Sequence, residues 1–400
     1  MSAFAGITLP STDEEVWRYS RVADLDLDSY HPAATDGPPP AEIPAAIEAA
    51  LASVPVRGAT VALVNGRVAH VEVNVPGVDV ANPDDRGLVG SVMSEPTDVF
   101  ARMNDDFAAD ITTVRIAPSA NVEAPIVVAH WTDETDIATF PRLVIESADD
   151  SNARVIEYHA SPDAVPMLTV PVTELAVGRG AQLGYLNAQN LGRATWQIGS
   201  QVSAVDADAT FTSAAAAFGG DYARQRTDCR LIGRGATGRL RAVYFGEGEQ
   251  MLDFRTFQDH AAPDTTSNLL FKGAVGGHSR SVYTGLIRVR KNARGTNAFQ
   301  TNRNIKLSEG AWAESVPNLE IENNDVRCSH ASAVGPIDED QRFYLESRGV
   351  PTAVAERLVV TGFFDDVLSR LPVPAAAAAL RSLVAGKLDR QVPVRGSAES

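Results

Sequence analysis

The chain has 400 residues, an apolar fraction of 44% and a formal net charge of −16. This charge argues against a nucleic-acid-binding surface of general type, and the sequence contains no apolar run long enough to span a membrane. Two cysteines cannot build a disulfide framework, and Met1–Gly6 lacks a basic start followed by an apolar core, so we expect a cytoplasmic protein.

Residues 1–112 are expected to form a mixed α/β N-terminal region. Two overlapping capping boxes within residues 11–18 predict a short amphipathic helix, and the proline-rich residues 31–40 predict a linker. Apolar spacing and the Asn-Gly pair at 65–66 predict three further elements. These are a helix within 41–53, a hairpin within 61–75 and a helix within 97–110.

Residues 113–335 lose all helical periodicity. Short alternating segments, such as Leu252–Phe257 and Ser281–Val289, follow one another and are separated by glycines and turn residues. A sandwich, a barrel and a β-helix would all produce this pattern. Small residues recur before strands, with several gaps of about twenty residues, and the small side chains of Ala214–Ala217 suit tightly stacked coils. The pattern is therefore consistent with a β-helix without demonstrating one.

Residues 336–400 return to helical patterns. Acidic residues 338–340 predict the start of a helix that ends at Gly349, and Pro351 predicts the start of a second helix. The expected apolar stripe of the second helix comprises Val354, Leu358, Val359, Phe363, Val367 and Leu368. A third helix is expected over 375–389, followed by a loose tail.

The segment Asn324–His330 carries the strongest chemical signal. It places Cys328 two residues before His330, and in a strand both side chains would project from one face, about 7 Å apart. Thiolate and imidazole are ligands of soft and borderline metals, iron–sulfur clusters included. Taken alone, the pair is better explained as a small buried residue beside a satisfied polar neighbour.

Other motifs have simpler explanations. Gly233–Gly238 matches the dinucleotide-binding pattern but is followed by a strand, which favours a turn between coils. The sequence has neither a P-loop nor an H-E-x-x-H motif, so we expect no ATP site on this chain. Cys229, His260 and His278 are each expected to be structural.

The surroundings of Cys328 and His330 change the interpretation. A series of motifs occurs in one order: Thr265–Ser267, Phe271–Gly273, Tyr283–Val289, Gln300–Asn304, Asn324–His330, Phe343–Gly349 and Gly362–Phe364. This series resembles the SufB/SufD family of iron–sulfur cluster assembly proteins. Thr301 stands where the SufB branch has a cysteine, and Ser329 and Ala331 stand where it has glutamates, so the resemblance is to the SufD branch. The family's usual Gly-Ala-Thr after the histidine is replaced here by small residues at 331–333.

The resemblance implies a mainly β fold with a right-handed parallel β-helix core at 113–335 and a C-terminal α-helical domain at 336–400. It also implies a non-catalytic scaffold subunit that pairs with a SufB-like subunit through the β-helix and docks a SufC-like ATPase on its C-terminal helices. His330, with Cys328 as a second candidate, would help to hold a transient iron–sulfur cluster shared with SufB. Flavin binding and pairing of the chain with itself are left open.

Two alternatives remain at this stage. A carbohydrate-active β-helix enzyme would need a pair of facing acids, for which Asp253, Asp259 and Asp264 are the clustered candidates. A purely structural partner of SufB would differ from the scaffold only in having no cluster ligand.

Overall fold

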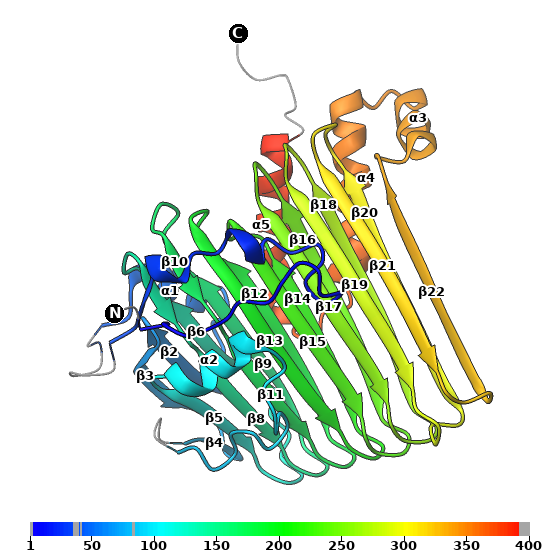
Figure 1. Ribbon diagram of the computed structural model, residues 1–400. Helices are drawn as coiled ribbons and strands as arrows, with labels where there is room; N and C mark the ends of the chain where they lie inside the picture. The colour runs from blue at the N-terminus through cyan, green and yellow to red at the C-terminus, as the bar shows by residue number, and fades with distance from the viewer. Residues whose placement is uncertain (1–2, 35–39, 41, 82–84, 392–400) are drawn as a thin grey trace.

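The chain winds into a parallel β-helix whose coils alternate between two sheets (Figure 1). The computed structural model describes residues 3–34, 40, 42–81 and 85–391. We call the two sheets A and B. The parallel strands of sheet A are β5 (Ile111–Ile116), β8 (Arg142–Ser147), β11 (Val172–Val177), β13 (Thr195–Val205), β15 (Tyr222–Leu231), β17 (Met251–His260), β19 (Arg280–Val289) and β21 (Trp312–Ile321). Those of sheet B are β6 (Ile126–Trp131), β9 (Asn152–Ala160), β12 (Gln182–Asn190), β14 (Thr210–Ala217), β16 (Thr237–Gly246), β18 (Thr266–Val275), β20 (Thr296–Lys306) and β22 (Val326–Gly335).

Short strands close the N-terminal end of both sheets. In sheet B, β2 (Ala59–Val64) lies parallel to β6 and antiparallel to β3 (Arg67–Val73), which confirms the predicted hairpin. In sheet A, β4 (Val78–Val80) pairs antiparallel with β5. Three strands flank sheet A: β1 (His31–Pro32), β7 (Ile137–Thr139) and β10 (Met167–Thr169). Strand β1 occupies the start of the predicted linker, whose residues 35–39 lie outside the described residues.

One coil is longer than the spacing of small residues suggested. Thr210 pairs with Thr237, 27 positions on, and Thr237 pairs with Thr266, 29 positions on. The expected repeat near twenty residues was therefore wrong. Each coil has to supply a strand to each sheet and the turns between them.

The space between the sheets is filled by alternate side chains of both. Phe211, Leu240 and Leu269 point inward from neighbouring strands of sheet B and are buried there. Ala214 and Ala216 instead belong to the core outside sheet B, with Phe364 among its members. Their small size leaves room for helices on the outer face, as well as for stacked coils.

Helices cover the outer faces of the sheets. Sheet B contacts α1 (Ala45–Ala52) and α4 (Thr352–Leu368), and α5 (Ala377–Gln391) follows α4 after the 3-10 turn η3 (Pro374–Ala376). Sheet A contacts α2 (Val99–Phe107), whose N-cap is Asp98. Short 3-10 turns η1 (Val22–Asp24) and η2 (Leu27–Ser29) precede them, and α3 (Glu339–Ser347) packs on α4. Within the described chain, no helix has the length and apolarity needed to cross a membrane.

The helix expected at residues 11–18 is absent. One predicted capping interaction forms, since the Ser11 backbone amide donates to Glu14 Oε1 at 3.0 Å. The backbone then continues as turns. Trp17 is buried against Phe100 and lies below the Arg224 guanidinium, 4.1 Å from its ring centroid. Burial of this side chain against sheet A overrides the local helical signal.

The three C-terminal helices occur where predicted, but the stripe expected on α4 was partly wrong. The buried residues of α4 are Ala355, Val360, Phe364, Val367 and Leu368, whereas Leu358 is 51% exposed. The predicted stripe combined two faces of the helix, one packed on sheet B and one turned towards α3. The predicted tail falls mostly on residues 392–400, outside the described residues.

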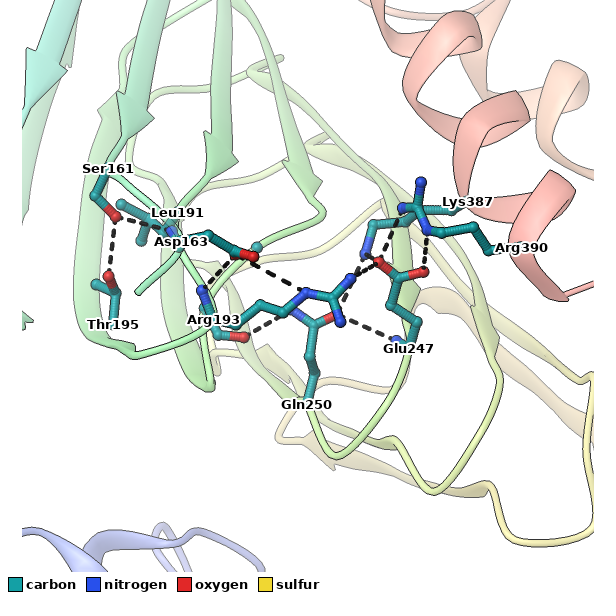
Figure 2. Close-up of polar contacts among 12 residues, drawn as sticks. Ser161, Asp163, Leu191, Arg193, Thr195, Glu247, Gln250, Lys387 and Arg390 are labelled. Carbon is teal, nitrogen blue, oxygen red and sulfur yellow. Dashed lines mark hydrogen bonds and ion pairs between the residues drawn. The ribbon is translucent and has the colours of Figure 1, made fainter. Parts of the chain in front are cut away.

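A buried carboxylate fastens α5 to the solenoid (Figure 2). Glu247 follows β16, and its Oε1 lies 2.7 Å from Arg193 Nη2, 2.9 Å from Arg390 Nη2 and 3.3 Å from Lys387 Nζ. Burial lowers the pKa of Lys387 to about 8, although Glu247 opposes that shift. Lys387 Nζ also donates to Gln250 Oε1 at 3.2 Å, so the helix is tied to two residues of the turn between β16 and β17.

Candidate functional site

Cys328 and His330 lie on the last strand of the solenoid. Strand β22 pairs with β20 on one side only, and Cys328 stands opposite Ala298 while His330 stands opposite Gln300. Ala298 and Gln300 are buried and point into the space between the sheets. Because parallel neighbours in register project to the same side, Cys328 and His330 line the same interior space at its open end. They are not enclosed within the core.

The Cys328 thiol is half-buried. It packs against a small apolar cluster that contains Ile287, Val289 and Ala298. Burial raises the pKa of Cys328, although a hydrogen bond with the Ala298 backbone partly opposes that shift. The thiol is therefore largely protonated at neutral pH, and metal binding would have to displace its proton.

His330 is exposed and lies above an unusual buried amide. The side chain of Gln300 is only 2% exposed, yet neither its Oε1 nor its Nε2 has a hydrogen-bond partner among the described residues. Gly285 leaves room for this amide, because a Cβ at position 285 would lie 2.2 Å from Gln300 Nε2. A buried polar group without a hydrogen-bond partner destabilises the fold. The Gln300 amide beside His330 therefore needs a partner from outside the described residues.

The surface around these two residues is apolar and has two free strand edges. Leu319, Ile321 and Val334 are 37%, 44% and 40% exposed at the same end. Strand β21 pairs only with β19, and β22 only with β20, among the described residues. Each of these ten-residue strands therefore presents a row of unpaired backbone groups, which is a template for another chain.

A groove lies next to this end, between the C-terminal helices and sheet B. Its volume is about 1030 Å³, and it is lined by parts of β20 and β22 together with α3 and α4. Phe343, Tyr344 and Leu358 are 70%, 59% and 51% exposed on these two helices. The helices thus present apolar side chains that are left exposed in the part of the chain that the structure describes.

Cys229, Gly233–Gly238 and His260 occupy structural positions, as predicted, whereas the structural role expected of His278 stays a prediction. Cys229 is buried, and burial raises the pKa of its thiol to about 12. Gly233–Gly238 forms a turn between coils that leads into β16. His260 is buried between two hydroxyl groups, and His278 is exposed at a turn.

The three acids considered for carbohydrate chemistry are engaged elsewhere. Asp253 is buried and paired with Arg224, Asp259 is paired with Arg290, and Asp264 is paired with Arg234. No observation on these residues favours a glycosidase, because each carboxylate already has its cationic partner.

Sequence reasoning overlooked two features. One is the Gln300 side-chain amide, which has no hydrogen-bond partner among the described residues and which the sequence shows only as part of the Gln300–Asn304 motif. The other is a buried group formed by His130, Glu157 and His159. Its signal was present in the Glu157-x-His159 spacing, which repeats the i, i+2 relation of Cys328 and His330.

Comparison with known proteins gives a consistent result. The family described as "SUF system FeS cluster assembly, SufBD core domain" matches residues 130–363. An iron-sulfur cluster assembly SufBD family protein of Mycobacterium tuberculosis is 39% identical over 203 residues, which are 49% of this chain and about half (51%) of that protein. The corresponding Mycobacterium leprae protein is 31% identical over 325 residues, 78% of this chain and 81% of its own length. The iron-sulfur cluster assembly protein SufD of Escherichia coli is 28% identical over 301 residues, 74% of this chain and 70% of that protein.

The match covers the solenoid from β6 to α4, and the motifs at its C-terminal end lie on the strands and helices that form the open end and the groove. The chain belongs to the SufB/SufD family and is a SufD-like member of it.

Proposed function

We propose that this chain is a non-catalytic scaffold subunit for iron–sulfur cluster assembly, and that the open end of its solenoid binds the cluster and a partner subunit. The observation that carries the proposal is the placement of Cys328 and His330 on the final strand, which is paired on one side only, beside exposed apolar residues. A ligand pair on a strand edge can be completed by residues of a second chain. The free cysteines suit a reducing compartment, and we include a cytoplasmic location in the proposal.

The partner at the open end is proposed to be a SufB-like subunit. A related β-helix could add its own terminal strands to β21 and β22, which would satisfy the free backbone groups and bury Leu319, Ile321 and Val334. A second copy of this chain has the same features and is the competing occupant when the sister subunit is absent.

The groove at α3 and α4 is proposed as the docking site of a SufC-like ATPase. Exposed aromatic side chains, here Phe343 and Tyr344, are typical anchors of protein interfaces. The sequence contains no P-loop, so nucleotide hydrolysis would be supplied by that partner.

The nascent cluster is cargo in this proposal. Imidazole and thiolate both bind iron, and a neutral imidazole leaves more easily than a thiolate, which suits a surface that must release what it holds. The unpartnered Gln300 amide can hydrogen-bond the bound group or orient the His330 ring from beneath.

The test is the His330→Ala variant co-expressed with SufB-like and SufC-like subunits, with His278→Ala as the matched control at an exposed histidine of an earlier coil. We expect the complex to assemble with the wild-type chain and with both variants. Iron and sulfide content after anaerobic reconstitution should fall about tenfold or more with His330→Ala, since even an outer partner of a metal ligand is worth about 10- to 100-fold in affinity.

Full cluster loading of the His330→Ala complex would refute the ligand role and leave a purely structural partner. Failure of the wild-type chain to co-purify with either subunit would refute the scaffold role itself.

A further inference from the structure

A second group of metal-ligating side chains lies inside the solenoid, far along the chain from the open end. His130 stands on β6 and His159 on β9, and the two are direct register partners. Glu157 precedes His159 by two residues and points inward with it. Glu157 Oε1 lies 3.2 Å from His130 Nε2 and 3.3 Å from His159 Nε2. One imidazole from each of two neighbouring coils thus meets a single carboxylate oxygen.

All three residues are buried, and the imidazoles are poorly satisfied. Their exposed fractions are 4%, 1% and 1% for His130, Glu157 and His159. Within the described residues, both nitrogens of His130 and Nε2 of His159 have no partner that meets hydrogen-bond geometry, and the two Nε2 atoms have only the close approach to Glu157 Oε1. Native proteins seldom leave such groups buried and unpaired, so these nitrogens require an additional partner.

Glu157 is held in place by its other oxygen. Glu157 Oε2 accepts hydrogen bonds from Thr173 Oγ1 at 2.9 Å and from the hydroxyl of Tyr185. Oε1 is left facing the two imidazoles. Metal-binding carboxylates are commonly oriented by outer hydrogen bonds of this kind.

We propose that His130, Glu157 and His159 bind one divalent transition-metal ion of the Zn²⁺ or Fe²⁺ type inside the solenoid. Two imidazoles and one carboxylate are the protein ligands of many such sites, and the three ligand atoms lie within 4.8 Å of one another. The chemistry of the donors excludes Mg²⁺ and Ca²⁺ as preferred occupants, since those ions select oxygen ligands.

Metal binding requires one local movement. The imidazole rings are stacked, with centroids 4.4 Å apart and planes within 6°. A ligated ion lies near the plane of each imidazole, so one ring has to turn out of the stack. Since the site is enclosed by neighbouring coils, we infer that the ion enters while the N-terminal coils fold.

The proposal is tested with the full chain, unfolded and refolded with Co²⁺ as a spectroscopic probe and then separated from free metal. We expect one Co²⁺ per chain and visible ligand-field bands, both retained in a Cys328→Ser/His330→Ala double variant. This control separates the internal site from the open end, so either proposal can fail without the other.

Two variants address the ligands. His159→Gln should abolish the bands, and Thr173→Val, which removes only the outer hydrogen bond to Glu157, should weaken Co²⁺ binding about 10- to 100-fold. Wild-type protein that refolds, as judged by circular dichroism, without retaining Co²⁺ or Zn²⁺ would overturn the proposal whatever the variants do. Bands that persist in a folded His159→Gln variant would overturn it as well.

Discussion

The buried His260 predicts a measurable loss of stability on mild acidification. It is fully buried, with Nδ1 2.8 Å from Thr265 Oγ1 and Nε2 2.8 Å from Ser267 Oγ. Burial lowers the pKa of His260 from 6.5 to about 4, although the nearby Asp259 opposes that shift. The folded chain therefore keeps a neutral imidazole at a pH at which the unfolded chain protonates it.

The sign and size of the change in the free energy of unfolding follow from the difference between the folded-state and unfolded-state pKa of His260. Between pH 6.5 and pH 4 the unfolded state binds more protons than the folded state, so the free energy of unfolding falls as the pH falls. The stability is fully retained above the unfolded pKa and is lost progressively below it. From pH 7 to pH 5 this one group should remove about 2 kcal/mol, out of a limit of about 3 kcal/mol for the whole shift.

The assay is urea unfolding at pH 7, 6 and 5 on wild type, His260→Gln and His278→Gln. Glutamine keeps hydrogen-bonding groups but does not titrate in this range, so His260→Gln should lose about 2 kcal/mol less than wild type between pH 7 and pH 5. His278 is exposed, and its variant should follow the wild-type slope. Equal slopes for wild type and His260→Gln would refute the reasoning.

Two further predictions concern packing and thiol reactivity. Gly273→Ala would place a Cβ 1.9 Å from the ring of the fully buried Tyr244, so we expect a loss of about 1–3 kcal/mol in urea unfolding. Gly362→Ala is the control, since no atom lies within 4 Å of the added Cβ and this helical position should gain about 0.5–1 kcal/mol. Ellman's reagent should titrate one thiol in the native protein, the half-buried Cys328, and two after denaturation, because burial raises the pKa of Cys229 to about 12. Rapid reaction of both thiols in the native state would contradict the packing of Cys229.

Local features of the fold were readable from the sequence wherever a short-range rule decides them. The turn at Asn65 and Gly66 has positive φ at both residues, as the Asn-Gly pair predicts. Asp98 caps α2 and Pro351 precedes α4, again by local geometry. The i, i+2 relation of Cys328 and His330 needed only strand periodicity to be interpreted.

Long-range packing decided the rest. The length of a coil depends on how many residues are needed to run from one sheet to the other and back. That number depends on the distance between the sheets, which local sequence patterns do not give. The helix predicted from the capping boxes near Ser11 is absent because burial of Trp17 on sheet A outweighs an isolated turn of helix. Which face of a helix is buried depends on the elements that pack against it. Leu358 of α4 is therefore exposed although its spacing predicted a buried position.

The sequence by itself therefore determined the strand-rich character of residues 113–335, the position of the helices beyond them and the pairing of a thiol with an imidazole on one strand face. Only the tertiary structure brought His130 next to His159 across one coil, left the Gln300 side-chain amide without a hydrogen-bond partner among the described residues, and placed β22 at the open end of the solenoid. The physical reason is that spacing along a strand is set by covalent geometry, whereas contact between these coils is set by the register of residues 27 to 29 positions apart.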